Sequence, residues 1–170
     1  MSDSLSRQPT ERRATFAALV DNEPGVLHRV VGMFAARGYN IESLTVAETD
    51  HQAHTSRITV VTRGAPPILA QIRAQLEKII QVRGVEDVGE DPEAVERELA
   101  LIRLACDEPE RSAGIKLAEI HNARIIAEYG GLLFEITGSP EEIDVFHARL
   151  RPLGPVEISR TGVLSIRRSA

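Results

Sequence analysis

Apolar residues follow two different spacings along the first half of the chain. Residues 14 to 20 form a short apolar run, whereas from Val26 to Phe34 apolar side chains recur three or four positions apart, until Arg37-Gly38. The first spacing is typical of a buried strand, and the second of an amphipathic helix that ends at a glycine. The next segments are rich in β-branched residues and predict a hairpin, after which Pro66-Pro67 opens another helix. The expected order is strand, helix, two strands, helix and strand, over residues 14–20, 26–37, 40–47, 57–62, 66–80 and 82–88.

The second half repeats this order after a charged segment. Gly89 to Glu98 is rich in acidic residues and includes Pro92, which favours a linker or a short helical lead-in. Further on, Ser139-Pro140-Glu141-Glu142 has the spacing of a helix start with a capping box. The expected elements are a strand, a helix, two strands, a helix and two short strands, over residues 99–105, 110–122, 124–128, 132–137, 139–150, 156–158 and 163–166.

Both halves therefore predict a βαββαβ unit, so the expected fold class is α+β with two tandem ferredoxin-like sandwiches. We expect a disordered leader over residues 1–12, a first domain over residues 13–89 and a C-terminal domain over residues 90–170. A sandwich of this kind leaves one sheet face and its edge strands uncovered, which favours pairing with a second copy. A homodimer is the expected state.

Composition narrows the classes of partner. The apolar fraction is 42%, aromatic residues make up only 4%, and the formal net charge is −5. This acidic balance argues against nucleic acids and anionic membranes as principal partners. RNA recognition by such a sandwich needs exposed aromatic side chains on the central strands, where the sequence offers only Phe16. We therefore expect neither nucleic acid nor membrane as a partner.

The single cysteine and the short apolar runs bear on the compartment. Cys106 excludes an internal disulfide framework and a multi-cysteine zinc site, and its apolar surroundings suit a small core residue. No stretch approaches the ~20 apolar residues that span a bilayer, and the first residues lack the apolar segment of a secretory signal. We expect a cytoplasmic protein, unless an organelle-targeting segment has been removed.

Residues able to perform catalysis are scarce in this chain. Contexts for a Ser-His-Asp nucleophile, phosphate loops and zinc-protease spacings are all absent, so we assign no catalytic residue. His51 and His54 lie close to Asp50 in a predicted hairpin loop, where a weak metal site competes with the simpler interpretation of a solvated loop. His28 lies near the start of the first helix, either as a polar-face residue or as a ligand contact. We predict no metal site and no catalysis by this chain alone.

The segment over residues 21–27 has the composition of a helix start with free amides. Asn22 is a favoured capping residue, Pro24 suits the first helical turn, and Gly25 leaves the backbone open to close approach. Amides of the first turn lack intrahelical partners and carry the positive end of the helix dipole, which suits a small carboxylate. The alternative is an ordinary strand-to-helix turn that binds nothing. The expected donors are the amides of Gly25, Val26 and Leu27.

Two strings around the first helix resemble one protein family. DNEPGVLHRV, at residues 21–30, is followed after the helix by RGYNIESLTV at residues 37–46. A capped P-G-x-L turn is shared by ACT domains generally, but the second string resembles the small, regulatory subunit of acetolactate synthase (acetohydroxyacid synthase). ERELALIR, at residues 96–103, is similar to that family's second signature. The likeness runs from Arg13 to Arg168, and in the C-terminal half it rests more on layout than on motif.

The resemblance implies an N-terminal ACT domain and a non-catalytic role. Small subunits of this family activate a large catalytic subunit that uses thiamine diphosphate, Mg and FAD, and they confer feedback inhibition by valine in branched-chain amino-acid biosynthesis. The resemblance thus implies that this chain itself holds no cofactor. The family's ligand residues match Asn22, Gly25, Val26 and Leu27 of one chain, with Asn40 and Ile41 of the neighbouring chain in a homodimer.

The matched residues suit an amino acid chemically. A carboxylate would bind the free amides, Asn22 and Asn40 could accept from the ammonium group, and Ile41 and Val26 are candidates for the apolar pocket. One methylene is worth only about 1–3 kcal/mol in such a pocket, so the choice among valine, leucine and isoleucine stays open. The alternative function is a stand-alone ACT-type amino-acid sensor that acts on another enzyme or regulator.

Overall fold

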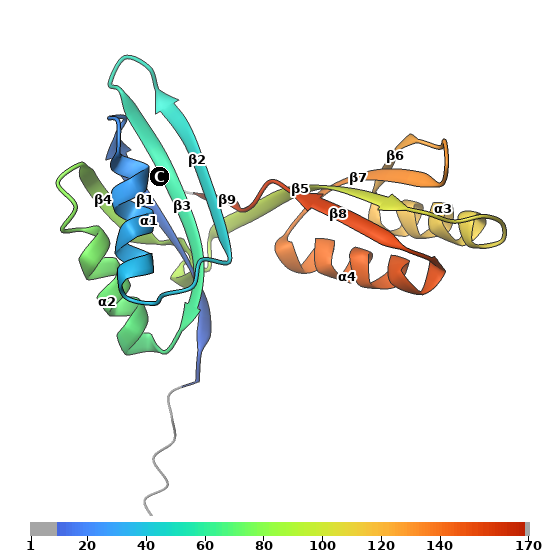
Figure 1. Ribbon diagram of the computed structural model, residues 1–170, viewed down its shortest axis with the longest axis horizontal. Coiled ribbons are helices and arrows are strands. Elements are labelled where there is room, and N and C mark those ends of the chain that lie inside the picture. Colours follow the sequence, from blue (N-terminus) through green and yellow to red (C-terminus); the bar gives the residue numbers. More distant parts are fainter. Residues whose placement is uncertain (1–9, 169–170) are drawn as a thin grey trace, which may run out of the picture. The chain divides into compact units, whose positions relative to one another are not determined.

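The structure, a computed structural model, describes residues 10–168, so most of the expected leader lies outside the described residues. The described chain divides into two compact units, each an antiparallel sheet with two α-helices on one face (Figure 1). The first unit holds the residues up to Ala94 together with Ser165 to Arg168, and the second holds Val95–Leu164. The expected α+β fold is confirmed.

The first unit has the predicted order of strands and helices. Its sheet runs in the order β2-β3-β1-β4, so β1 and β3 are central while β2 and β4 form the edges. Every neighbouring pair in this sheet is antiparallel. The elements are β1 (Arg12–Asp21), α1 (Val26–Ala36), β2 (Ser43–Asp50), β3 (Thr55–Gly64), α2 (Pro66–Leu76), β4 (Val82–Asp87) and the 3-10 helix η1 (Val88–Glu90).

The second unit repeats the arrangement around β5. Its main sheet has the order β6-β7-β5-β8, and the last strand, β9, also pairs with β5, although all of β9 after Leu164 belongs to the first unit. No helix among residues 10–168 is long and apolar enough to cross a membrane. The elements are β5 (Ala94–Leu104), α3 (Glu110–His121), β6 (Arg124–Ala127), β7 (Leu132–Gly138), α4 (Pro140–Leu150), the 3-10 helix η2 (Arg151–Leu153), β8 (Val156–Arg160) and β9 (Leu164–Arg167).

Alternation along the central strand builds the core of the first unit. Every second residue of β1 points toward the helices, and each of these side chains is at most 2% exposed: Ala14, Phe16, Ala18 and Val20. Both helices cover this sheet face with apolar stripes at three- and four-residue spacing. Their buried members are Val26, Val30, Met33, Phe34, Leu69, Ile72 and Leu76. The apolar spacing in the sequence predicted most of these buried helix positions, but it also included Leu27, Val31 and Ile68, which are exposed.

Helix α4 begins with the predicted capping box. The hydroxyl of Ser139 accepts the Glu142 amide at 3.2 Å, and the Glu142 carboxylate accepts the Ser139 amide at 2.6 Å. This reciprocal pair satisfies two of the amides that a helix start leaves without partners. Pro140 occupies the first helical position, where its missing N–H costs nothing.

His121, at the end of α3, belongs to the packing of the second unit. Its ring lies 5.3 Å from the ring of Phe146 on α4, which in turn packs edge to face against Phe134. Burial lowers the pKa of His121, and the positive charge of Arg149 adds to the effect. The neutral imidazole is therefore the form that this packing favours.

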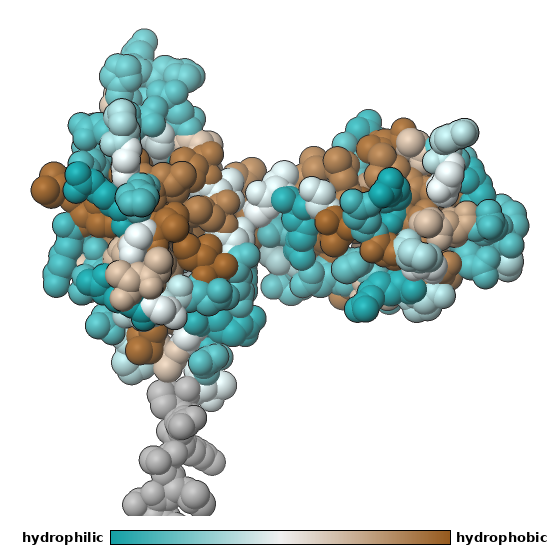
Figure 2. All heavy atoms as spheres, in the orientation of Figure 1, coloured by the Kyte–Doolittle hydropathy of each residue, from teal (hydrophilic) through white to brown (hydrophobic). Residues whose placement is uncertain are grey.

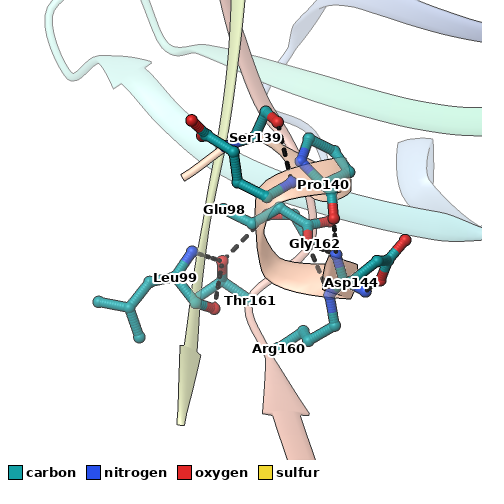
Figure 3. Close-up of polar contacts among 9 residues, drawn as sticks. Glu98, Leu99, Ser139, Pro140, Asp144, Arg160, Thr161 and Gly162 are labelled. Atoms are coloured by element: carbon teal, nitrogen blue, oxygen red, sulfur yellow. Dashed lines mark hydrogen bonds and ion pairs between the residues drawn. The ribbon is translucent and has the colours of Figure 1, made fainter. Parts of the chain in front are cut away.

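A buried ion pair holds the middle of β5 to the end of β8 (Figure 3). Glu98 is only 5% exposed, and the Nε atom of Arg160 donates to its carboxylate at 2.6 Å. The same guanidinium donates to Asp144 at 2.6 Å and to the carbonyl oxygen of Pro140 at 3.3 Å. Burial opposes the charge of Arg160, but the hydrogen bonds with Asp144 and Glu98 outweigh burial and raise its pKa.

Two element boundaries depart furthest from the sequence expectation. Helix α2 ends at Leu76 instead of reaching Ile80, whose side chain is 90% exposed after a turn. Strand β5 begins at Ala94 instead of Leu99, so the charged segment that favours a linker is partly strand. Pairing with β9 supplies backbone partners that the local composition does not reveal.

The chain crosses between the two units twice. It leaves the first unit after Ala94 and returns at Ser165, so the unit is built from two separate stretches of sequence. Arg167 fixes the returning stretch through ion pairs with Asp91 at 2.9 Å and Glu86 at 4.0 Å. The sequence predicts a single boundary, between residues 89 and 90, whereas in the structure the chain leaves the first unit after Ala94 and returns to it at Ser165.

Ion pairs connect the start of β1 to the end of β4 and to η1. Arg12, which we expected in the leader, is the first residue of β1 and lies opposite Gly64 of β3. Its guanidinium pairs with Asp87 at 2.8 Å and with Glu90 at 2.5 Å. These partners are more than seventy positions away in sequence, so no local pattern predicted them.

Candidate functional site

The predicted ligand turn connects β1 to α1, with Gly25 as its N-cap residue. Gly25 has φ 88° and ψ −6°, a left-handed conformation that favours glycine, and an added Cβ would meet no atom within 4 Å. Asn22 therefore does not cap the helix, and Pro24 precedes it instead of lying in its first turn. The backbone at Gly25 is exposed and open to a ligand, as the sequence predicted.

The amides at this helix start are mostly unpaired. The Val26 amide donates to the carbonyl oxygen of Glu23 at 3.3 Å, which closes the turn. Within residues 10–168, the amides of Gly25, Leu27 and His28 have no hydrogen-bond acceptor. Of the three expected donors, Val26 is thus occupied within the turn, and the next free amide is that of His28. Such a set of free amides suits an anion.

Neighbouring elements hold the turn in place. The Asp21 carboxylate pairs with Arg83 of β4 at 2.6 Å, and the Asp21 amide donates to the carbonyl oxygen of Gln81 at 2.8 Å. The Asn22 amide donates at 2.7 Å to the carbonyl oxygen of His54, the residue just before β3. Sequence reasoning missed Arg83 and the His54 carbonyl group, because both act through pairings across the sheet. The turn is consequently preorganised before any ligand binds.

The side chains of the matched residues differ in exposure. Leu27 is 40% exposed, whereas Val26 is 7% exposed and belongs to the core, so only its backbone remains available to a ligand. Asn40 is exposed, and its carbonyl oxygen accepts the Thr62 hydroxyl at 2.6 Å. Ile41 is partly buried against the core.

The two groups of matched residues lie at opposite ends of the same sheet (Figure 1). Asp21, just before the turn, pairs with Thr55 at the start of β3, while Asn40 contacts Thr62 near the end of β3. Seven residues of extended strand separate these two contacts, a distance of about 23 Å. A single chain therefore does not bring Asn22–Leu27 and Asn40–Ile41 together.

An apolar strip runs along the β2 edge of the first unit. On α1, Leu27 is 40% and Val31 is 36% exposed, and on β2 Val46 is 44% exposed. Leu44 lies between them and is only partly buried. Figure 2 shows hydrophobic side chains gathered over α1 and its side toward β2. Strand β2 has no neighbour on its outer side within the described sheet, so both its backbone and this strip are uncovered.

The hairpin loop between β2 and β3 has the features of a solvated loop. Hydrogen bonds from the amides of Ala53 and Gln52 lower the pKa of Asp50, and His51 pairs with Glu48 at 2.8 Å. Among residues 10–168, no group of three His, Cys, Asp or Glu side chains could hold a metal ion. The weak metal site considered for Asp50, His51 and His54 is therefore not formed.

Two family models match the chain, one for each unit. Residues 16–84 match the ACT domain described as "AHAS small subunit-like", which covers the ligand turn and the RGYNIESLTV string. Residues 97–169 match the model described as "Small subunit of acetolactate synthase".

Relatives from several kingdoms match most of the chain. The probable acetolactate synthase small subunit of Archaeoglobus fulgidus is 39% identical over 153 residues, 89% of this chain and 94% of the relative. The small subunit of acetolactate synthase isozyme 3 of Escherichia coli is 37% identical, with coverage of 92% and 96%. The chloroplastic small subunit 2 of Arabidopsis thaliana is 39% identical, but the chain spans only 32% of its length.

A solved structure supports the same assignment. The crystal structure of the acetolactate synthase small subunit from Thermotoga maritima superimposes with a TM-score of 0.81 at 34% identity. The alignment covers 94% of this chain and 99% of that chain, so both units and their order are shared. From its motifs, its fold and these matches, the chain belongs to the family of acetolactate synthase small, regulatory subunits.

Proposed function

We propose that this chain binds valine between the ACT domains of two copies and so imposes feedback inhibition on acetolactate synthase. A small subunit of this enzyme associates with the large catalytic subunit. The observation that carries the proposal is the separation of the matched residues. Asn22–Leu27 and Asn40–Ile41 lie about 23 Å apart in one chain, at opposite ends of the sheet, so a second chain is needed to join them.

A two-fold axis beside β2 would join these halves. Rotation about an axis perpendicular to the sheet pairs β2 with β2 of the second copy and exchanges the two ends of the sheet. Asn22–Leu27 of one chain then lies beside Asn40–Ile41 of the partner subunit. The same operation covers the apolar strip of Leu27, Val31 and Val46, which favours the pairing. The proposed state is therefore a homodimer with two equivalent sites.

The chemistry of each half suits one part of an amino acid. The free amides of Gly25, Leu27 and His28 would bind the carboxylate. The side-chain oxygens of Asn22 and Asn40 would accept from the ammonium group, and the exposed side chain of Leu27 would contact the isopropyl group. Because the site lies between two chains, valine would stabilise one arrangement of the dimer over others, as an allosteric effector must.

The test is an activity assay on the complex. Acetolactate formation by the large subunit is measured alone, with this chain, and with this chain plus valine. We expect stimulation by the chain and inhibition by valine. Absence of both effects would reject the regulatory role. Valine binding without any effect on the large subunit would instead support a stand-alone amino-acid sensor.

The cofactors and the compartment follow from the family proposal. Thiamine diphosphate, Mg and FAD are assigned to the large catalytic subunit, and none is assigned to this chain. We propose the cytoplasm as its compartment, although the plant relatives are chloroplastic proteins.

A further inference from the structure

Among residues 10–168, Tyr129 is the one Phe or Tyr side chain that lies outside the packed core. The chain has four Phe and two Tyr residues. All four Phe side chains are at most 1% exposed, and Tyr39 packs edge to face on Phe34. Tyr129, between β6 and β7, has an exposed fraction of 102%. In a chain with so few aromatic residues, a ring left wholly in water calls for a reason other than the core.

The backbone around Tyr129 is fixed on both sides. One nitrogen of the Arg111 guanidinium donates to the carbonyl oxygens of Glu128 and Gly131, at 3.4 Å each, and another pairs with the Glu128 carboxylate. An added Cβ at Gly131 would collide with the carbonyl oxygen of Leu104, so only glycine fits there. The hairpin tip therefore presents the tyrosine ring from a constrained backbone, which lowers the entropy cost of binding.

A hollow with an acidic lining lies at the hairpin tip, where Glu128, Gly130 and Gly131, the residues on either side of Tyr129, belong to its lining. Its volume is about 590 Å³, and its lining includes Cys106, Asp107, Glu108, Arg111 and Glu128. The lining carries three carboxylates and one guanidinium, a net charge of −2. Arg111 is already bound to Glu128 and the hairpin carbonyl groups, so the charge open to a partner is negative.

We propose that the β6–β7 hairpin tip docks this chain on the large catalytic subunit of acetolactate synthase. The Tyr129 ring inserts into an apolar pocket of that subunit, and basic side chains around the pocket face Asp107 and Glu108 of this chain. Tyrosine is among the residues that most often dominate binding energy at interfaces. The inference rests on the association of the small and large subunits and adds the surface that makes it.

A second copy of this chain is the less suitable occupant. Two such tips brought together by a symmetry axis would place carboxylate against carboxylate, since Asp107, Glu108 and Glu128 line the hollow at the tip in each copy. Pairing between copies is already accounted for by the β2 edge and its apolar strip in the first unit.

The main test compares Tyr129→Ala with the unmodified chain in binding to the large subunit. We expect the dissociation constant to rise about 30-fold, the effect typical of a dominant interface residue. Tyr129→Phe retains the ring and should change affinity by less than about threefold. Ile80→Ala, which truncates another side chain that is 90% exposed, is the matched control and should leave binding unchanged. Thermal unfolding and valine binding should be the same for all variants.

A second test addresses the charges. The double variant Asp107→Asn, Glu108→Gln should associate with the large subunit more slowly and with a weaker dependence on salt, because the acidic lining steers a basic partner. An unchanged association rate at low salt would refute the proposal that Asp107 and Glu108 face basic side chains of the large subunit.

The remaining outcomes are distinguishable. If the unmodified chain does not bind the large subunit, the association and this inference both fail. If it binds and Tyr129→Ala binds equally well, only the hairpin assignment fails. A change in the oligomeric state of the free chain, measured by light scattering, with affinity for the large subunit intact would assign the tip to contacts between copies and reject the proposal.

Discussion

Replacing Gly25 by aspartate tests whether an effector carboxylate binds at the start of α1. The exposed backbone has room for the new side chain, since no atom lies within 4 Å of an added Cβ. The aspartate carboxylate would then lie close to the amides of Leu27 and His28, where we place the carboxylate of valine. Two like charges in one small site repel each other, so valine should bind less tightly.

The size of the effect follows from the exposure of the turn. Two unit charges about 4 Å apart repel by about 1 kcal/mol at the dielectric constant of water and by about 4 kcal/mol at a protein surface. These limits correspond to about a 5-fold and about a 700-fold loss of affinity. Because Gly25 is exposed, we expect a value in the lower part of this range, at least about tenfold.

Gly25→Asn is the matched control. Asparagine has the same shape as aspartate, tolerates the left-handed conformation at φ 88° equally well and carries no charge. Both variants share the backbone strain, of about 1 kcal/mol or more, so their unfolding midpoints should fall together. Only the difference between them reports the charge.

The assay is inhibition of acetolactate formation by valine in the reconstituted enzyme, with valine binding to the free chain measured by calorimetry. Gly25→Asp should raise the half-inhibitory concentration at least about tenfold, and Gly25→Asn less than about threefold. Stimulation of the large subunit without valine should persist in both. Equal inhibition curves for the two variants would refute the placement of the carboxylate at these amides.

Three further predictions concern stability and symmetry. Arg160→Met should destabilise the second unit by about 2–4 kcal/mol in urea unfolding, because it leaves the buried Glu98 carboxylate without its partner, and Arg160→Lys should recover part of the loss. The pKa of His121 is lowered in the fold, so the unfolded chain binds a proton more readily than the folded chain, and stability falls as the pH drops below about 6.5. His121→Gln should flatten this fall between about pH 7 and about pH 5 in urea unfolding. In mixed dimers of Gly25→Asp and Asn40→Ala chains, one shared site carries both changes and the other carries neither, so calorimetry should find high-affinity valine binding at one site per dimer. A site that used both Gly25 and Asn40 of the same chain would be altered in both chains and would not give this result.

The order of elements was predictable from sequence because each element has its own spacing of apolar residues. Apolar and polar residues alternate only weakly along β1, but its run of small and apolar residues ends at a turn, as a strand does. Along α1, buried residues recur at helical spacing from Val26 to Phe34. The capping box at Ser139 is local in sequence and was predicted in full. Local patterns of this kind depend on residues a few positions apart, which a single sequence displays.

Contacts between distant segments were not predictable. The partners of Asp21, at Arg83, and of Arg12, at Asp87, lie more than sixty positions away. The hydrogen bond from Asn22 to the His54 carbonyl group depends on register across the sheet and on no side chain. Residue type alone likewise predicted Asn22 as the helix cap. The N-cap residue is Gly25 instead, in a left-handed conformation.

The return of the chain to the first unit changes how the protein can be divided. In genetic terms, residues 95–164 form an insert within the first unit, and a stop codon after Asp91 would also delete Arg167 and its ion pairs. The two ends of the insert are adjacent: the Arg168 amide donates to the Glu93 carbonyl oxygen at 3.2 Å. An internal deletion that joins residue 94 to residue 165 through a short turn would therefore retain every part of the first unit, including the tail that a truncation discards.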